Sequence, residues 1–405
     1  MKKPLLWIFL LALFLRLLVV CLGVGFDKDL SFFDARDYDR HAMNLLSGKG
    51  FTNGSAWASR TPVYPLFLAA IYNFFGHSYL AVRLIQALLG AFSILLFYGI
   101  FHFYFSKKVS LWATFLCACH PILIFYVGNI LSETLGLFLL ALFLFVFLHG
   151  KESAHSWGGG VLFGVLLLCR APLIFFLPFV MFHIVREKER PFRSVLGFVV
   201  ALLLVLSPWI VRNYRLLHAF IPLATHGGTT FWDANNPNAL LDPSKTGLAS
   251  HWVPTGKVVR KVAGEEILLS EVEGDRTLFK QGFFFWKELL RENPPALGYL
   301  FLRKALAAFS LHGGKSPQVL FGYGLVYLVC LPWGLALSLR LEKRPTLLYG
   351  VILQYLLCSL IFFGRAKYRM VIEPYLVVFV TLALLKCVDG LLSLCYNRKI
   401  RTSFK

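Results

Sequence analysis

Residues 31–65 read SFFDARDYDRHAMNLLSGKGFTNGSAWASRTPVYP and form a polar stretch between the first two long apolar runs of the chain. Asp34, Asp37 and Asp39 lie close together in it, and a glycine-rich segment and Arg60 follow them. Carboxylates held against a bilayer are costly, so they usually mark a functional site. The stretch therefore predicts a functional site at a membrane surface.

The composition identifies a membrane protein. Of the 405 residues, 58% are hydrophobic and only 15% are charged, and the mean hydropathy is +0.67. Several apolar runs are about 20 residues long, which is enough for a helix to cross about 30 Å of hydrocarbon. These runs are continuously apolar, whereas the strands of a transmembrane β-barrel alternate. We therefore predict an all-α polytopic membrane protein.

The formal net charge of +20 does not indicate nucleic acid, because of where the charges lie. Lys and Arg crowd the short connections between apolar runs, which is typical of cytoplasmic loops. The remaining Lys and Arg residues lie in the longer polar segments, where they can bind an anion near the outer surface. A lipid phosphate is the natural candidate, and membrane lipids are expected partners.

About ten transmembrane helices are expected, with both termini in the cytoplasm. Arg16 lies within the first, either packed inside the bundle or in contact with a lipid phosphate. The segment around Arg170 and Pro172 is either one kinked helix or a break between two short helices; the break keeps the basic loop at 186–193 inside. The expected spans are residues 5–24, 80–105, 111–127, 133–148, 157–169, 173–185, 194–211, 319–339, 346–363 and 371–392.

The whole chain, residues 1–405, is expected to be a single membrane domain with three outer segments. They are a first outer loop at 25–79, a large outer loop at 212–318 and a basic outer loop at 364–370. Apolar residues at helical spacing predict interfacial helices at 36–47 and 298–311.

The first outer loop offers two groups of candidate residues. Asp34 is either a catalytic carboxylate or the N-cap of the 36–47 helix, with Asp37 as its capping-box partner; the two roles are compatible. Arg60 lies among prolines and aromatic residues at the depth of lipid phosphates, although the prolines there can be purely structural. Tyr38 and Tyr64 are candidates for contacts with a sugar or an acceptor.

Three candidate groups follow further along the chain. Glu133 is either a carboxylate favoured by the start of its helix or a second acidic residue of the site. Arg212 is a further candidate for binding the donor phosphate. The segment after it carries a glycine pair, Trp232 and Asn235, which suit a sugar, or is an ordinary turn-rich loop. The basic outer loop breaks the positive-inside trend and predicts a phosphate clamp; its cations are Arg365, Lys367 and Arg369.

In their order, these motifs resemble a known family. The set comprises an acidic first outer loop, R-x-P-x-Y-P, S-E-T, S-P-W-x-x-R-N-Y and a late R-x-K-Y-R. Together they resemble membrane glycosyltransferases of the GT-C fold, in the bacterial dolichyl-phosphate-mannose protein mannosyltransferase-like and aminoarabinose-transferase-like group. The resemblance covers most of the chain.

The resemblance implies transfer of a sugar from a polyprenyl-phosphate carrier to an envelope glycolipid, polymer or protein on the outer face of the bacterial inner membrane. It places Asp34 at the family's catalytic aspartate, and Arg60 and the basic outer loop at its phosphate-binding positions. Some members hold a metal through an acidic residue where this chain has Ser59. No cofactor is expected to be required, and a divalent cation has no further support, because the histidines are scattered.

The chemistry of sugar transfer calls for the same set of side chains, namely a carboxylate and several cations. A polyprenyl phosphate is a good leaving group, so one carboxylate base and several cations suffice. Inversion at the anomeric carbon would follow from a single displacement. The alternatives are a polysaccharide ligase or polymerase and a transporter of lipid-linked sugars, although a transporter would require more polar spans and an internal repeat.

Overall fold

The computed structural model describes residues 2–23, 30, 32–150, 154–187, 190–241, 258–262, 265–309, 317–362, 364 and 366–403. These residues are almost entirely helical, with one short antiparallel hairpin. The elements are α1 (Lys2–Leu22), α2 (Phe33–Leu46), α3 (Val63–Phe75), α4 (Tyr79–Tyr104), α5 (Lys107–Cys119), α6 (Pro121–Phe125), η1 (Tyr126–Gly128), α7 (Glu133–His149), η2 (Ala154–Gly158), α8 (Gly159–Cys169), η3 (Ala171–Phe176), α9 (Leu177–Glu187), α10 (Pro191–Leu217), α11 (Gly227–Ala234), α12 (Pro237–Leu241), β1 (Val259–Val262), β2 (Glu265–Leu268), α13 (Glu271–Glu292), α14 (Pro294–Phe309), α15 (Pro317–Ser338), α16 (Thr346–Ile361), α17 (Ala366–Arg369) and α18 (Glu373–Ser403).

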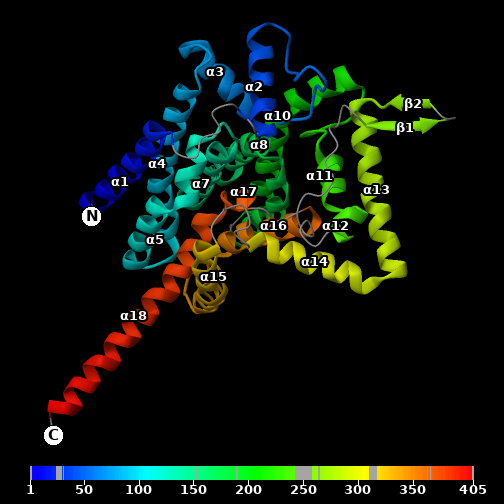
Figure 1. The fold of residues 1–405 in the computed structure, drawn as a ribbon. Coiled ribbons are helices and arrows are strands. Elements are labelled where there is room, and N and C mark those ends of the chain that lie inside the picture. The colour runs from blue at the N-terminus through cyan, green and yellow to red at the C-terminus, as the bar shows by residue number, and fades with distance from the viewer. Residues whose placement is uncertain are drawn as a thin grey trace.

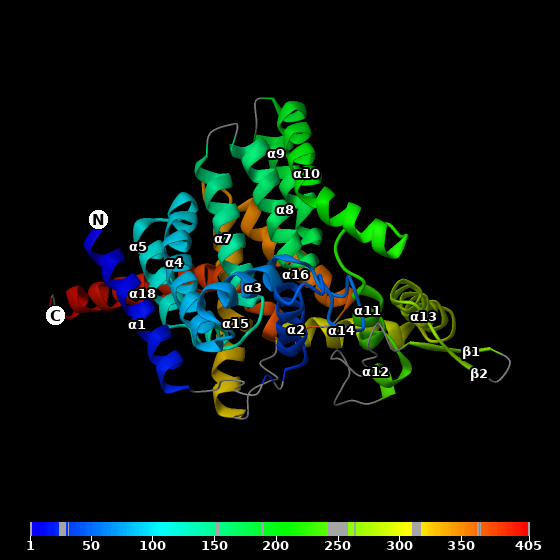
Figure 2. The same cartoon turned by 90° about the horizontal axis from the view of Figure 1, so that it is seen from above.

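The helices form a central bundle with a lobe beside it (Figures 1 and 2). In both views α7 and α8 lie in the middle and α1, α4 and α5 lie on one side. The lobe on the other side consists of α11, α12, α13 and the hairpin, with α14 leading back toward the bundle. The lobe is built from the sequence of the large outer loop.

Four helices of the described chain are long and apolar enough to cross a membrane. They are Lys3–Leu22, Tyr79–Tyr104, Pro191–Leu217 and Glu373–Ser393, and a fifth span results if Lys107–Cys119 and Pro121–Gly128, bent by 49°, are counted together. Further apolar helices are shorter, and α7 and α16 are among them. The multi-pass helical architecture is therefore confirmed, whereas ten spans stays a prediction.

Glycines allow the central helices to approach closely. A Cβ atom at Gly160 of α8 would lie 2.3 Å from the carbonyl oxygen of Phe198 on α10, so only glycine fits at this crossing. Phe143, Phe163 and Phe176 are fully buried around it. Arg16 is also buried in the bundle, where it donates to the carbonyl oxygens of Ala12 and Ala118; its position inside the bundle is therefore the correct alternative.

The helix break at Arg170 is real. Helix α8 ends at Cys169, Arg170 is extended with φ −141° and ψ 90°, and a 3-10 turn precedes α9. The segment thus forms two short helices rather than one kinked helix. The break turns the Arg170 side chain into the protein, where it forms an ion pair with Glu133.

The first outer loop contains more helix than the sequence analysis predicts. Helix α2 starts at Phe33 rather than at residue 36, and its N-cap residue Phe32 makes no side-chain cap hydrogen bond. The N-cap interpretation of Asp34 is therefore wrong, because this residue lies within the first helical turn. Helix α3 was not expected; Pro62 and Pro65 are compatible with its start because a helix needs no N–H donors there.

The large outer loop also differs from expectation. Its interfacial helix, expected at 298–311, is α14 and begins at Pro294. Before it lies the unexpected helix α13, which is amphipathic and starts with a capping box between Ser270 and Glu273. This serine and glutamate are the sequence signal that could have revealed α13.

Candidate functional site

The first outer loop and the basic outer loop meet at Asp34. Its Oδ1 accepts a hydrogen bond from Arg60 Nη2 at 2.7 Å, and its Oδ2 accepts one from Lys367 Nζ on α17. Lys367 lies 333 positions after Asp34 in the chain. The expected approach of the two loops is therefore observed for these three residues.

Asp37 shares Arg60 with Asp34. Arg60 Nε donates to Asp37 Oδ2 at 2.5 Å, and Asn53 Nδ2 donates to Asp37 Oδ1 at 2.6 Å. The guanidinium also lies over the ring of Tyr38, 5.2 Å from its centroid. The side chain of Asp37 is 5% exposed and that of Asp34 27% exposed. Asp37 is thus the more buried of the two carboxylates, and Asp34 is the more exposed.

Glu133 connects the helix bundle to this cluster. It begins α7, and its Oε1 lies 3.1 Å from Arg170 Nη1 and 3.8 Å from Lys367 Nζ. Glu133 is thus the first residue of its helix and also lies in the charged cluster, so the two expected roles are compatible, and its role in a site stays a prediction. Arg170 was missed as a site residue, although an arginine between two apolar runs was the available signal.

The cluster contains as many carboxylates as cations: Asp34, Asp37 and Glu133 against Arg60, Arg170 and Lys367. Burial alone would raise the pKa of Asp34, but Lys367 and Arg60 hold that pKa well below its usual range. The same pairing raises the pKa of Lys367 despite its burial. Both groups are therefore charged at neutral pH.

His226 is a site residue that the sequence analysis did not select. It precedes α11, beside the glycine pair, and lies in the electric field of Arg60, Asp34 and Lys367. Burial and then Arg60 lower the pKa of His226 to about 4, although the carboxylates oppose the shift. A neutral imidazole thus lies next to the charged cluster.

Tyr38 borders the cluster and Tyr64 lies behind it. The Tyr38 hydroxyl is 3.2 Å from Ser132 Oγ, and Tyr64 donates to Gln86 Oε1 at 2.9 Å. The two rings pack edge to face with their centroids 4.9 Å apart. Tyr64 is fully buried and packs against Tyr38, and a contact of either ring with a sugar or an acceptor stays a prediction.

Arg212 is close to the first outer loop but does not join the carboxylates. Its Nη1 and Nη2 donate to the carbonyl oxygens of Trp57 and Phe51, both at 2.6 Å, and its guanidinium stacks on Trp209. The arginine therefore shapes the loop that carries Arg60.

Arg369 belongs to a second buried cluster. Its Nε donates to Glu373 Oε2 at 2.8 Å and its Nη1 to the carbonyl oxygen of Phe309. Glu373 also accepts from Tyr327 at 2.6 Å and lies 3.4 Å from His120 Nε2. Of the expected phosphate clamp, only Lys367 is placed at Asp34, while Arg365 lies outside the described residues.

The proposed sugar contacts in the large outer loop are engaged elsewhere. Asn235 donates to the carbonyl oxygens of Phe231 and Ile361 and accepts from Trp286 and Lys304. Trp232, on α11, packs against the small apolar cluster of Val258, Leu269 and Leu278. In this structure Trp232 therefore packs within the lobe, whereas Asn235 connects the lobe to α14 and α16.

Glu271, the first residue of α13, connects the lobe to the first outer loop. Its carboxylate accepts from the backbone N–H of Trp57 at 2.6 Å, from that of Ala58 at 2.9 Å and from the hydroxyl of Thr225. It thereby positions the chain just before Arg60 and just before His226. The sequence carried no signal for this role beyond its capping position.

The described residues do not offer a set of metal ligands. No group of three or more His, Cys, Asp or Glu side chains is placed to hold a metal ion in this part of the chain. The oxygens of Asp34 and Asp37 instead face Arg60, Lys367 and Asn53. These side chains therefore do not fit a bound divalent cation.

Comparisons with known proteins agree with the expected resemblance. Residues 59–211 match the family model of dolichyl-phosphate-mannose-protein mannosyltransferase. No curated protein sequence matches the chain significantly.

Solved structures reveal the fold. The oligosaccharyltransferase of Archaeoglobus fulgidus tethered with an acceptor peptide is similar over 96% of this chain and 50% of its own, at 15% identity and a TM-score of 0.56. Archaeal oligosaccharyltransferase AglB from the same organism, in complex with an inhibitory peptide and a dolichol-phosphate, is similar over 99% of this chain and 51% of its own. The sequence identity is 13% and the TM-score is 0.56. ArnT from Cupriavidus metallidurans aligns with 88% of this chain and 74% of its own, at 14% identity and a TM-score of 0.37. The chain spans about half the length of the oligosaccharyltransferases, and their likeness confirms the GT-C fold.

Proposed function

Because the chain has the GT-C fold and a segment that matches a mannosyltransferase family, we propose that it is a glycosyltransferase. It moves a sugar from a polyprenyl-phosphate carrier to a hydroxyl group of an acceptor on the outer face of the membrane. The acceptor is an envelope glycolipid, a polymer or a protein. The similar AglB structure holds a dolichol-phosphate, which supports a polyprenyl donor.

One observation carries this proposal: a partly exposed carboxylate, Asp34, is held between two cations, Arg60 and Lys367. Transfer from a polyprenyl phosphate needs a base for the acceptor hydroxyl and positive charge for the departing phosphate. The three side chains supply both within one cluster. The site is also largely buried, where such charges act more strongly than in water.

The ion pairs suggest how donor binding activates the base. In this structure, Lys367 and Arg60 keep Asp34 charged but weakly basic, because they lower its pKa. A donor phosphate competes with Asp34 for the same two cations. As they turn toward the phosphate, the pKa of Asp34 rises, and the carboxylate becomes a stronger base only when the donor is present.

The reaction is then a single displacement. The acceptor oxygen attacks the anomeric carbon as its proton passes to Asp34, and the bond between that carbon and the phosphate oxygen breaks. The bonding electrons leave with the polyprenyl phosphate, whose added charge Lys367 and Arg60 neutralise. Attack opposite to the leaving group inverts the anomeric configuration.

The surrounding residues hold this arrangement. Glu133, which is itself paired with Arg170, attracts Lys367 to the cluster from the bundle side, and Asp37 orients Arg60. Arg365 stays a candidate contact for the donor phosphate. We place the site on the outer face of the bacterial inner membrane, with both termini in the cytoplasm, because the short basic connections lie at the other end of the bundle.

Asp34→Asn tests the proposal against a matched control, Asp39→Asn, on the same helix. Asp39 accepts from Tyr72 and His77 rather than from the cluster. Envelope glycolipids and glycoproteins would be compared by mass spectrometry in cells that express the wild type, either variant or no protein. We expect one sugar modification to disappear with Asp34→Asn and to persist with Asp39→Asn. Full modification in cells that express Asp34→Asn would contradict the assignment of Asp34 as the catalytic base. Gain or loss of whole polymers would indicate a polysaccharide ligase instead.

A further inference from the structure

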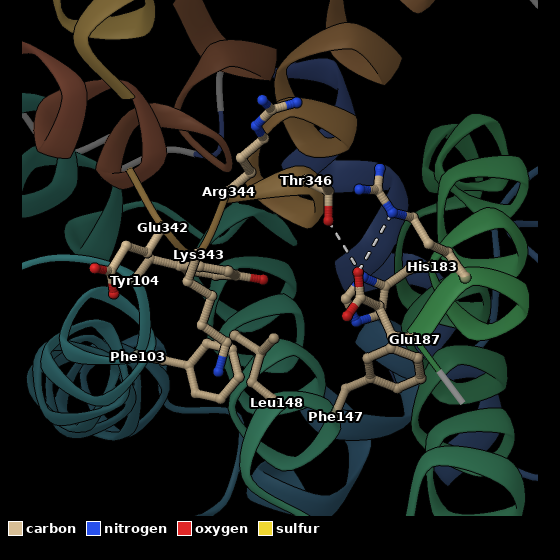
Figure 3. Close-up of a pocket in the computed structure, with 11 residues that line it drawn as sticks. Phe103, Tyr104, Phe147, Leu148, His183, Glu187, Glu342, Lys343, Arg344 and Thr346 are labelled. Carbon is tan, nitrogen blue, oxygen red and sulfur yellow. Dashed lines mark hydrogen bonds and ion pairs between the residues drawn. The ribbon is translucent and has the colours of Figure 1, made fainter. Parts of the chain in front are cut away.

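A polar cavity of about 600 Å³ lies at the ends of four helices (Figure 3). Residues at the C-terminal ends of α4, α7 and α9 line it, together with the loop between α15 and α16 and the first residue of α16. We call it the inner-face cavity. Its volume is within the range of small-molecule binding sites.

The inner-face cavity lies away from the proposed active site. Helix α7 has 17 residues and begins at Glu133, which contacts the Asp34 cluster, whereas Leu148 near its other end lines the cavity. At 1.5 Å per residue these two ends are about 25 Å apart. The cavity is also next to the basic connections at 186–193 and 340–344, which the proposed topology places in the cytoplasm. It therefore opens at the inner surface of the membrane.

The lining of the cavity combines aromatic rings with charged side chains. Lys343 extends over Phe103, with Nζ 3.2 Å from the ring centroid, and Phe147 lies nearby in Figure 3. Arg186 Nε lies 3.6 Å from Glu187 Oε1, and these side chains are 53% and 48% exposed. A pair this exposed is weak and can exchange partners.

The charge balance of the inner-face cavity favours an anion. Arg186, Lys343 and Arg344 outnumber the carboxylates Glu187 and Glu342 by one, and His183 hydrogen-bonds with Thr346. Arginine and lysine are the side chains that most often bind phosphate. Aromatic rings at the level where helices leave the hydrocarbon suit the boundary between a lipid headgroup and its acyl chains.

We propose that the inner-face cavity binds a phosphate ester, held by Arg186 and Lys343 over the aromatic rings. The source is either the headgroup of an anionic phospholipid in the inner leaflet or a soluble phosphate ester of the cytoplasm. The site rests on the proposed topology and not on the transferase reaction, so it can fail without the active site failing.

Lipid binding to the purified full chain tests this site. Phosphatidylglycerol, phosphatidylcholine and free glycerol phosphate would be titrated and followed by native mass spectrometry. The test variant is Arg186→Ala with Lys343→Ala. The matched control is Lys108→Ala with Arg340→Ala, which removes two exposed cations of the same face that do not line the cavity. Thermal unfolding would verify that both variants are folded.

We expect the wild type and the control to bind a phosphate ester about a hundredfold more tightly than the test variant does, or about tenfold for each of the two charged contacts that it loses. Preference for phosphatidylglycerol over phosphatidylcholine assigns the site to the lipid. Binding of glycerol phosphate alone assigns it to a soluble ester. The proposal is overturned if neither anion binds selectively or if the folded test variant binds as the wild type does.

Discussion

Lys367 forms an ion pair with Asp34, across 333 positions of the chain, and Glu133 lies 3.8 Å from the same ammonium group. One lysine therefore joins the first outer loop, the start of a bundle helix and the basic outer loop. The proposed transferase depends on this relationship, because the same cation would hold the base before the donor arrives and the phosphate afterwards.

Lys367→Met should reduce transfer by a factor of about 10² to 10³, which is typical for loss of one transition-state charge donor. Lys367→Arg should retain more activity, since it keeps the charge. The measurement is transfer of a labelled sugar from a polyprenyl phosphate by the purified enzyme, with kcat and KM determined separately. Lys108→Met is the control, because Lys108 pairs with Asp389 while both side chains are exposed. An unchanged rate of transfer by Lys367→Met would show that Lys367 takes no part in the reaction.

The buried pair of Arg369 and Glu373 should act by positioning Lys367, which is two residues from Arg369. The side chains of the pair are 2% and 0% exposed, so breaking it leaves a buried charge and should cost about 3–5 kcal/mol of stability. Arg369→Met should therefore lower the melting temperature in detergent and slow transfer.

Combining Arg369→Met with Glu373→Leu removes both buried charges. This double variant should recover much of the melting temperature. If α17 still places Lys367 at Asp34, transfer should recover in parallel. A stable double variant with no donor binding would instead mean that Arg369 contacts the phosphate directly, as the sequence analysis proposed.

Glu271→Gln should loosen the connection between the lobe and the first outer loop. A glutamine has only one acceptor oxygen, so it cannot serve all of Trp57, Ala58 and Thr225. We expect lower thermal stability, because these hydrogen bonds are lost. We also expect a higher KM for the donor, because Arg60 follows shortly after the segment at 57–58 that Glu271 holds. Glu288→Gln, an exposed carboxylate of the same helix, is the control. Equal behaviour of the two variants would contradict a positioning role.

The sequence predicted the helical membrane class and the meeting of Asp34, Arg60 and Lys367 because charged residues outside long apolar runs are conspicuous. It could not separate Lys367 from Arg369, which are two positions apart in one basic run. Their different partners, Asp34 and Glu373, depend on how α17 is placed against α2 and α18. Tertiary packing decides that placement.

Other site features escaped prediction for similar reasons. Arg170 looked like part of a helix break, and only the structure joins it to Glu133. Glu271 resembles any acidic residue at the start of a helix until its partners Trp57 and Ala58, more than 200 positions away, are known. Buried polar contacts between distant loops leave no periodic pattern in the sequence, whereas buried apolar faces do.

Asp275 should make the stability of the lobe depend on pH. Burial raises the pKa of Asp275 to about 6, although the Gly228 N–H donates to its Oδ1 at 2.7 Å. Between pH 4 and 6 the folded chain therefore binds a proton that the unfolded chain does not, so this residue stabilises the fold as the pH falls through that window. Asp275→Asn keeps an acceptor oxygen for Gly228 and removes the titration. We expect its melting temperature in detergent to exceed that of the wild type at pH 7.5, by the equivalent of about 3 kcal/mol for a pKa raised from 3.8 to about 6, and the difference to disappear near pH 4. A difference that is constant between these pH values would show that Asp275 does not titrate as its burial requires.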